Sequence, residues 1–370
     1  FMKKLLFTKI SKDTIYLFLL LGLSLGLIVW TIQAVNYLDY VTQDGHGLKT
    51  YFLYSVLNFP KIIHRMIPFI FFISLFLILI NYETKNELLI FWTHGVTKIK
   101  FANVIIFLSV LLFILQIFIG AFVSPHFQYK SRALLKASNI DFFSSLIKEG
   151  KFINAVKNLT IFIDKKNIDG SFVNIFIDDS SKSNNKMTYA SKGIILDQDQ
   201  KKFFRLYDGK VINRNKNKFN VFSFDQIDID LSEYSSNTIL VPKIQEMPSK
   251  NLLQCSFDHA YKKINTDSRN CHISVIKDIN QELLKRFYKP LFIPIIAVIC
   301  CFLIILPKNN SKYKSQSKLT FLLGFCLLVF SETTLRYSST TLISTLLYIL
   351  APWIIFIFAY CLFYLKVKNA

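Results

Sequence analysis

Several motifs that would assign a catalytic chemistry are missing from this chain of 370 residues. There is no GxxxxGK[ST] phosphate loop, so the chain does not hydrolyse a nucleotide by that route. There is also no strand-to-helix nucleophile elbow, no HExxH zinc motif, no CxxC pair and no His/Cys cluster. We therefore expect no catalytic residue, no metal ion and no bound cofactor in this chain.

Acidic residues are scarce: the chain has 24 Asp and Glu against 44 Lys and Arg, a formal charge of +20. Such a charge can indicate nucleic-acid binding, but that interpretation requires a compact basic helix or basic residues interleaved with aromatic ones. Here the basic residues are scattered or lie beside apolar segments. Nucleic acid is therefore excluded as a partner. Regular acids within the apolar segments, which a proton-driven pump would need, are also missing.

Long apolar runs are abundant, and 52% of the residues are hydrophobic. A stretch of about 17–25 apolar residues is what an α-helix needs to cross a membrane, and these runs lack the alternation of a barrel strand. Three runs lie near the start of the chain and three near its end. They are Ile15–Val35, Ile67–Tyr82, Phe101–Val123, Leu291–Leu306, Leu319–Leu335 and Leu342–Leu365. The sequence therefore predicts a membrane protein with three helices in residues 1–123, an insert in residues 124–288 and three helices in residues 289–370.

Positive charges beside these runs indicate the orientation of the chain. Lysines precede the first run, fill the loop after the fourth and follow the sixth, whereas the loop after the first run carries Asp39, Asp44 and only Lys49. By the positive-inside rule both termini are cytoplasmic, and the insert lies outside the cytoplasm. The first run is too long for a cleaved signal peptide and lacks a small-residue cleavage site, so we expect a retained span.

The insert has the pattern of a β domain between helical connectors. Its strand-like segments are short and separated by turn sequences such as Asp169-Gly170 and Asp208-Gly209. The expected strands are Phe152–Val156, Leu159–Asp164, Val173–Asp178, Thr188–Leu196, Phe203–Asn213 and Phe219–Asp230. Strands of this length and spacing are typical of an antiparallel sandwich or a partly open barrel.

The loop between the second and third runs, about residues 83–97, contains the first candidate site. Glu87 opens an amphipathic helix of about two turns, and Gly95 is a natural helix stop. An acid at the head of an apolar helix that cannot span a membrane suits docking into a groove of another protein. An interfacial helix, lying on lipid with Glu87 at its N-terminus, fits these residues equally well.

Basic residues at the outer ends of the runs form the second candidate site, a ring that could hold a phosphate-bearing amphiphile. They are Lys61, His64, Arg65, Lys130, Arg132, Lys285, Arg286 and Lys289. Residue by residue, side chains that reach from the helix ends to the interface are the better explanation. Glu332 and Arg336, one helical turn apart, are expected to form an ion pair with each other rather than a ligand site.

Cys255 and Cys271 lie in the insert, outside the cytoplasm in this topology. They could form a disulfide in an oxidising compartment, but sixteen residues apart beside a helical stretch they do not require one. The sequence leaves their pairing open.

These features together resemble the lipopolysaccharide-export permease family, the F and G membrane subunits of the Lpt transporter. The resemblance runs over nearly the whole chain and rests on the order of its pieces in the arrangement of three helices, β insert and three helices. The pieces are Pro60, Met66-Ile67-Pro68, Glu87-Leu88, His94-Gly95-Val96, Gly150-Lys151-Phe152, Ile161-Phe162-Ile163, Glu282-Leu283, Arg286 and Pro290-Leu291. The Gly-Lys-Phe entry to the first strand favours the F subunit. The Leu306-Pro307-Lys308-Asn309 turn departs from the family's glycine-rich turn.

The resemblance implies a location in the bacterial inner membrane and partners for the chain. Family members pair with a second, G-like permease on a dimer of a separate ABC ATPase, which binds the ATP and Mg²⁺. The helix opened by Glu87 would be the coupling helix to that ATPase, with Leu88, Phe91, His94 and Gly95. The periplasmic insert would be a β-jellyroll that joins a bridge of similar jellyrolls by edge-to-edge strand addition.

The resemblance also gives the basic ring a ligand, since lipopolysaccharide carries phosphates. It would enter between the permeases through gates lined by the first and fifth helices. The residues expected to bind it are Lys61, Arg65, Arg132, Arg286, Lys289 and Arg336.

Two other functions are compatible with this topology. A non-transporting envelope scaffold or receptor would share the layout but would not need Glu87. A membrane-embedded enzyme that acts on lipid is least compatible, because no set of polar catalytic residues converges at one membrane depth.

Overall fold

A computed structural model describes the chain except residues 1, 39–46, 147–148, 157–158, 168–169, 181–184, 199–200, 216–217, 231–242, 261–270, 272–274, 340 and 369–370. The chain forms two compact units. Phe1–Ile32, Leu57–Tyr129 and Lys243–Ala370 make the first, which is helical. Gln33–Val56 and Lys130–Pro242 make the second, which contains the sheet.

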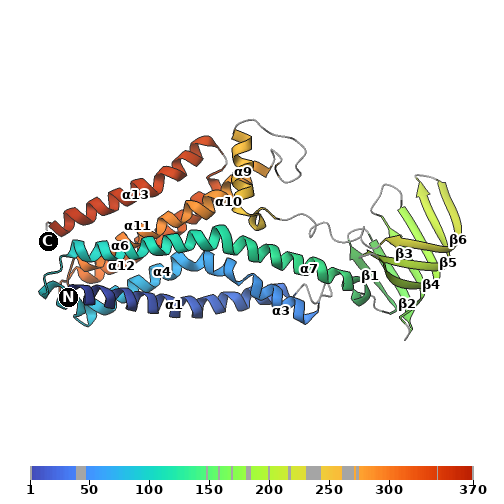
Figure 1. Cartoon of the computed structure of the whole chain (residues 1–370), viewed down its shortest axis with the longest axis horizontal. Helices are drawn as coiled ribbons and strands as arrows, with labels where there is room; N and C mark the ends of the chain where they lie inside the picture. Colours follow the sequence, from blue (N-terminus) through green and yellow to red (C-terminus); the bar gives the residue numbers. More distant parts are fainter. Residues whose placement is uncertain are drawn as a thin grey trace. The chain divides into compact units, whose positions relative to one another are not determined.

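The helices follow the apolar pattern of the sequence (Figure 1). They are α1 (Met2–Tyr37), α3 (Leu48–Leu57), α4 (Phe59–Thr84), α5 (Glu87–Thr93), α6 (Lys98–Phe118), α7 (Ser124–Leu146), α9 (Ser249–Ala260), α10 (Ile276–Phe287), α11 (Phe292–Cys301), α12 (Tyr313–Tyr337) and α13 (Leu342–Lys368). Short pieces join them: a π-helix, η1 (Ile119–Val123), and the 3-10 helices η3 (Ile244–Glu246), η5 (Lys289–Leu291) and η6 (Phe302–Ile304). Within the described part of the chain, six helical stretches are long and apolar enough to cross a membrane, one at each predicted span. The six expected helices are confirmed.

Helix α11 lies at the centre of the helical unit. It packs against α4, α6, α12 and α13, and nearly all of its side chains are buried. Pro294 is tolerated there because it lies in the first turn of α11, where the backbone N–H has no helical partner. In contrast, the apolar stretch of α1 is 6% buried, and leucines such as Leu19 and Leu23 are exposed.

All six expected strands are confirmed, each longer than predicted by a few residues. They are β1 (Lys151–Val156), β2 (Leu159–Lys166), β3 (Phe172–Asp179), β4 (Asn185–Gln198), β5 (Lys201–Asn215) and β6 (Lys218–Asp230). They form one antiparallel sheet in which each strand pairs with its neighbour in the sequence (Figure 1). The described strands therefore form an antiparallel meander, which is the inserted β domain that the sequence predicted.

One face of the sheet forms its core, and alternation along each strand determines which side chains lie there. Ile161 and Ile163 of β2, Phe172 and Ile175 of β3, and Phe204 of β5 are almost fully buried. Between them lies Gly193 of β4, where an added Cβ would come within 2.5 Å of Ile175 Cδ1 and 2.9 Å of Phe204 Cε2. Because Gly193 has no side chain, the side chains of Ile175 and Phe204 on the flanking strands can occupy the space above β4.

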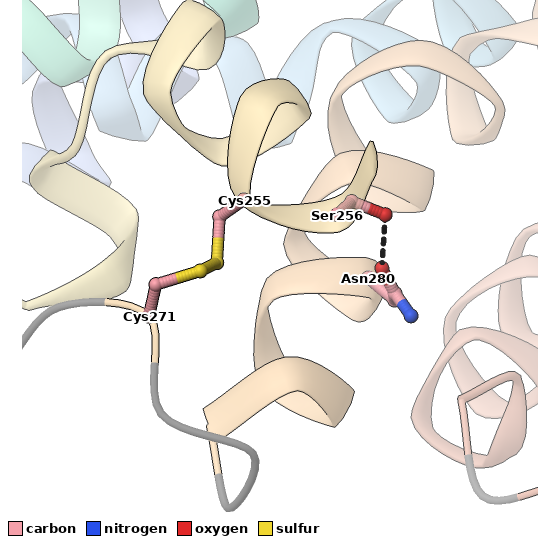
Figure 2. Close-up of a disulfide and its surroundings, with 4 residues drawn as sticks. All are labelled: Cys255, Ser256, Cys271 and Asn280. Carbon is pink, nitrogen blue, oxygen red and sulfur yellow. Dashed lines mark hydrogen bonds between the residues drawn. A yellow bond between two sulfur atoms is a disulfide. The ribbon is translucent and has the colours of Figure 1, made fainter. Parts of the chain in front are cut away.

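A disulfide joins the region of α9 to the chain just before α10. Cys255 of α9 is bonded to Cys271 across a Cα–Cα distance of 5.8 Å, and Ser256 Oγ donates a hydrogen bond of 2.9 Å to Asn280 Oδ1 of α10 (Figure 2). Leu252 of α9 and Ile279 of α10 are buried beside this link. The pairing that the sequence left open is therefore present.

Candidate functional sites

Helix α5 is the short helix predicted between the second and third spans, and its ends are set by backbone conformation. Asn86 precedes it with a left-handed φ of 58°, and Gly95 follows it with a φ of 71°. That second conformation favours glycine, because a Cβ atom is disfavoured at positive φ. The helix start at Glu87 and the stop at Gly95 are both confirmed.

The two faces of α5 differ in what they contact. Leu88 and Phe91, two of the residues predicted to couple to a partner, are each 2% exposed and belong to the core of the helical unit. The Phe91 ring centroid lies 5.1 Å from that of Phe101 on α6 and 6.2 Å from that of Tyr82 on α4. The Leu88 and Phe91 side chains thus pack α5 against the core of the helical unit, where Phe91 meets α4 and α6.

The opposite face of α5 is open. Leu89 is 60% exposed and Ile90 is 46% exposed. Thr93 and His94 are exposed as well, and His94 Nδ1 donates to the carbonyl of Ile90 over 2.7 Å. We call Leu89, Ile90, Thr93 and His94 the open face of α5. Apolar side chains exposed on a helix of two turns are typical of a docking surface.

Glu87, at the start of α5, has a partner within the chain. Its Oε2 lies 2.6 Å from Nζ of Lys9 on α1. The Glu87 side chain is 23% exposed, so it is not fully enclosed by this contact. Nearby, Tyr82 Oη donates a hydrogen bond of 2.5 Å to Oδ2 of Asp13 on α1.

A second candidate site, which we call the basic pocket, is an enclosed cavity of about 20 Å³. Its lining residues come from the start of α4, from η1 and α7, and from the segment η3–α10–η5. They are Lys61, His64, Arg65, Gly120, Ser124, Gln128, Gln245, Glu282, Lys285 and Lys289. The volume is that of a single water molecule.

Two buried polar atoms without a hydrogen-bond partner among the described residues lie in or beside the basic pocket: His64 lines it, and Gln116 Nε2 donates to the carbonyl of His64. Among the described residues, Nδ1 of His64 and Oε1 of Gln116 make no hydrogen bond, although both residues are more than nine-tenths buried. The His64 ring lies against Gly120 in the π-helix, where an added Cβ would be 2.3 Å from His64 Cε1. Single π-helical turns are frequent at functional sites.

The basic residues around this pocket are not equivalent. Lys285 Nζ lies 2.9 Å from Glu282 Oε2, and Lys289 is paired with Glu332. For Lys61 and Arg65 the described part of the chain offers no ion-pair partner, and Arg65 is exposed. The uncompensated positive charge therefore lies on α4.

Arg286 has an internal role. The side chain is 1% exposed and its Nε lies 3.1 Å from Glu282 Oε1. Its terminal nitrogens donate to the carbonyls of Met247 and Gln245, each over 3.0 Å, and to Ser249 Oγ over 2.9 Å. Arg286 thus joins α10 to the chain that enters α9.

The remaining predicted basic residues lie apart from the pocket lining. Arg132 is on α7, in the unit that contains the sheet. Arg336 is exposed near the end of α12. The ion pair expected between Arg336 and Glu332 is absent from the described residues, because Glu332 pairs with Lys289 of η5 instead. Sequence spacing finds partners one turn away, whereas this partner comes from another element.

Residues that sequence reasoning missed are those whose role depends on a contact between distant elements. Lys9 lies 78 residues from Glu87, and Asp13 lies 69 residues from Tyr82. No spacing rule connects such pairs. The exposed Leu89 and Ile90 could have been distinguished from the buried Leu88 and Phe91 only by knowing which face of α5 meets α4 and α6.

Three-residue clusters of His, Cys, Asp or Glu that could hold a metal ion are not found among the described residues.

Comparison with known proteins gives two matches. Residues 10–366 match the family described as lipopolysaccharide export system permease LptF/LptG. The chain is also similar to an uncharacterized protein, RP871, of Rickettsia prowazekii (strain Madrid E), with 28% identity over 232 residues. That alignment covers 61% of this chain and spans 63% of the length of the relative.

Proposed function

Since the chain belongs to the LptF/LptG family of lipopolysaccharide export permeases, we propose that it is a transport subunit that extracts lipopolysaccharide from the inner membrane. A separate ATPase chain would drive it. The observation that carries the proposal is the family match over residues 10–366, together with the helical unit and inserted sheet. The sequence itself contains no phosphate loop, which supports hydrolysis in a partner.

The open face of α5 is the proposed contact with that ATPase. Leu89 and Ile90 would enter an apolar groove, and the exposed part of Glu87 would meet a basic residue at its rim. Leu88 and Phe91 would act indirectly, because they pack α5 against α4 and α6. This division of α5 refines the coupling site expected from the sequence.

The experiment that tests this function is a pull-down of the tagged protein in mild detergent, with its partners identified by mass spectrometry. We expect a phosphate-loop ATPase and a second permease with the same layout. Glu87→Lys should be inserted normally but should lose the ATPase and export. Recovery of neither partner by the intact protein would favour the scaffold or receptor function instead.

Basic residues that line the basic pocket, rather than its interior of about 20 Å³, are the proposed contact with the lipopolysaccharide phosphates. Lys61 and Arg65 carry the charge that the described part of the chain does not neutralise, so they are the proposed contacts; Lys289 and Arg286 would support them through their acidic partners. Neutralising both Lys61 and Arg65 should weaken photocrosslinking to lipopolysaccharide, whereas Lys314→Gln in the first turn of α12 should not. Unchanged crosslinking would instead favour the explanation that Lys61 and Arg65 only reach from the helix end to the membrane interface.

The disulfide supports the orientation predicted from charge. Disulfides persist in oxidising compartments, so Cys255 and Cys271 would lie in the periplasm and both termini in the cytoplasm. The sheet between α7 and η3 would then be periplasmic, with β1 and β6 as the edges open to a bridge protein. A G-like second permease, an F-like identity for this chain, and roles for Arg132 and Arg336 remain proposals from the family resemblance.

A further inference from the structure

Large side chains of helix α1 are most deeply buried near its start. Ile10 is 2% exposed and Thr14 is 1% exposed, whereas Leu19, Leu23 and Ile32 farther along are each more than half exposed. We call Lys9, Ile10, Asp13 and Thr14 the α1 anchor.

The α1 anchor contacts the corner at which α4 gives way to α5. Lys9 Nζ lies 2.6 Å from Glu87 Oε2 and 5.7 Å from the centroid of the Tyr82 ring. Tyr82 Oη in turn donates to Asp13 Oδ2. Tyr82 is 3% exposed and its ring lies beside Phe91 of α5. One network of charge and aromatic contacts therefore connects α1, α4 and α5.

The network is suited to positioning rather than to stability. The Lys9 side chain is 50% exposed, and exposed ion pairs contribute little to folding. The contacts instead fix the positions of two side chains: Lys9 holds the carboxylate of Glu87, and Asp13 holds the hydroxyl of Tyr82. A shift of α5 would pull on α1 directly through Glu87 and Lys9. It would also act indirectly through Tyr82 of α4, whose ring lies beside Phe91 of α5 and whose hydroxyl bonds to Asp13.

We propose that Lys9 and Asp13 are positioning residues that join the start of α1 to α5, Lys9 directly through Glu87 and Asp13 indirectly through Tyr82 of α4, so that displacement of α5 by a docked partner moves α1. The proposal rests on the proposed function, which supplies the partner that displaces α5. Lys9 holds one oxygen of Glu87 and leaves the exposed part of the side chain to the partner.

The test uses the full complex in proteoliposomes and measures lipopolysaccharide released per ATP hydrolysed, together with the amount of ATPase that co-purifies. Lys9→Gln removes the cation, Lys9→Arg keeps it, and Lys12→Gln is the matched control, since Lys12 is exposed on the same helix. We expect Lys9→Gln to lower release per ATP roughly two- to fivefold, the effect of losing one exposed ion pair, with ATPase bound as in the wild type. Lys9→Arg and Lys12→Gln should resemble the wild type.

The outcomes separate this proposal from the proposed function. If the unaltered chain captures no ATPase, the proposed function fails. If it captures ATPase and transports, but Lys9→Gln releases as much lipid per ATP as the wild type, the link between α5 and α1 is refuted. A loss of ATPase binding in Lys9→Gln at unchanged release per ATP would also refute it, because Lys9 would then only shape the docking surface. Asp13→Asn with Tyr82→Phe tests the second contact and should show the same uncoupling.

Discussion

At the scale of single residues, burial separates two arginines that the sequence placed in one group. Arg65 is exposed and has no ion-pair partner in the described part of the chain. Arg286 is 1% exposed and bonds to Glu282, Ser249 and two carbonyls. A charge removed from water needs such partners, so Arg286 serves the fold while Arg65 stays open to a ligand.

Replacement of Arg286 should therefore cost much more than replacement of its neighbour. Arg286→Met leaves Oε1 of Glu282 and the carbonyls of Met247 and Gln245 without the donor they have here, and we expect a loss of about 3–5 kcal/mol in the free energy of unfolding. Lys285→Met removes a partly exposed pair with the same Glu282 and should cost less than about 1 kcal/mol. Denaturant titration in detergent measures both. Equal losses would show that Arg286 does not have this internal role.

A pH dependence follows from the pair between Arg205 of β5 and Asp228 of β6, which lie opposite each other in the sheet. Their two hydrogen bonds of 2.8 Å lower the pKa of Asp228. A carboxyl whose folded pKa is lowered stabilises the fold above its unfolded pKa of about 3.9, and this contribution is lost as the pH falls through the folded pKa.

Asp228→Asn should therefore weaken the β5–β6 pairing at pH 7 and have no effect below the lowered pKa of Asp228. Hydrogen exchange of the β5 and β6 amides, measured over this pH range in the full chain, checks the prediction. A penalty of the same size at both ends of the range would contradict it.

At the scale of elements, α5 packs against its own chain with one face and presents the other to the partner that we propose. Glu87–Thr93 makes only two turns, and an isolated helix of this length is not stable in water. Packing of Leu88 and Phe91 against α4 and α6 holds it in place. Its open face is then free for a partner.

Adjacent leucines of α5 provide a matched pair. Leu89→Ser should weaken ATPase binding and leave the stability of the chain unchanged, because Leu89 is 60% exposed. Leu88→Ser, at a position 2% exposed, should lower stability by about 2–5 kcal/mol, the range for large-to-small core substitutions. Thermal unfolding in detergent and co-purification of the ATPase distinguish the two. Loss of stability in both variants would show that α5 has no free docking face.

At the scale of the whole molecule, two kinds of chemistry support the orientation that we propose for the chain in the membrane. The lysines at the start of α1, before α12 and at the end of α13 indicate the cytoplasmic side. The Cys255–Cys271 disulfide indicates the oxidising side. These independent signals agree on one orientation.

Labelling with a membrane-impermeant maleimide tests this orientation in intact spheroplasts. Cys255 and Cys271 should react only after a reductant is added. A cysteine introduced by Lys314→Cys, exposed in the first turn of α12, should react only after the membrane is permeabilised. Labelling of Lys314→Cys in intact spheroplasts would show that the chain has the opposite orientation.

The sequence by itself determined the spans, the strands and the ends of α5. These features depend on local chemistry: apolar length, alternation, and glycine at positive φ. The order of the motifs also led to the family, because a resemblance depends only on the chain.

The tertiary structure alone decided which residues face one another. It paired Lys289 with Glu332, buried Arg286, placed Lys9 beside Glu87 and turned Leu88 inward while Leu89 stayed outside. It also closed the Cys255–Cys271 bond and arranged the six strands as a meander. Such contacts join elements far apart in the chain, so their energies depend on packing and burial, which composition, periodicity and spacing do not determine.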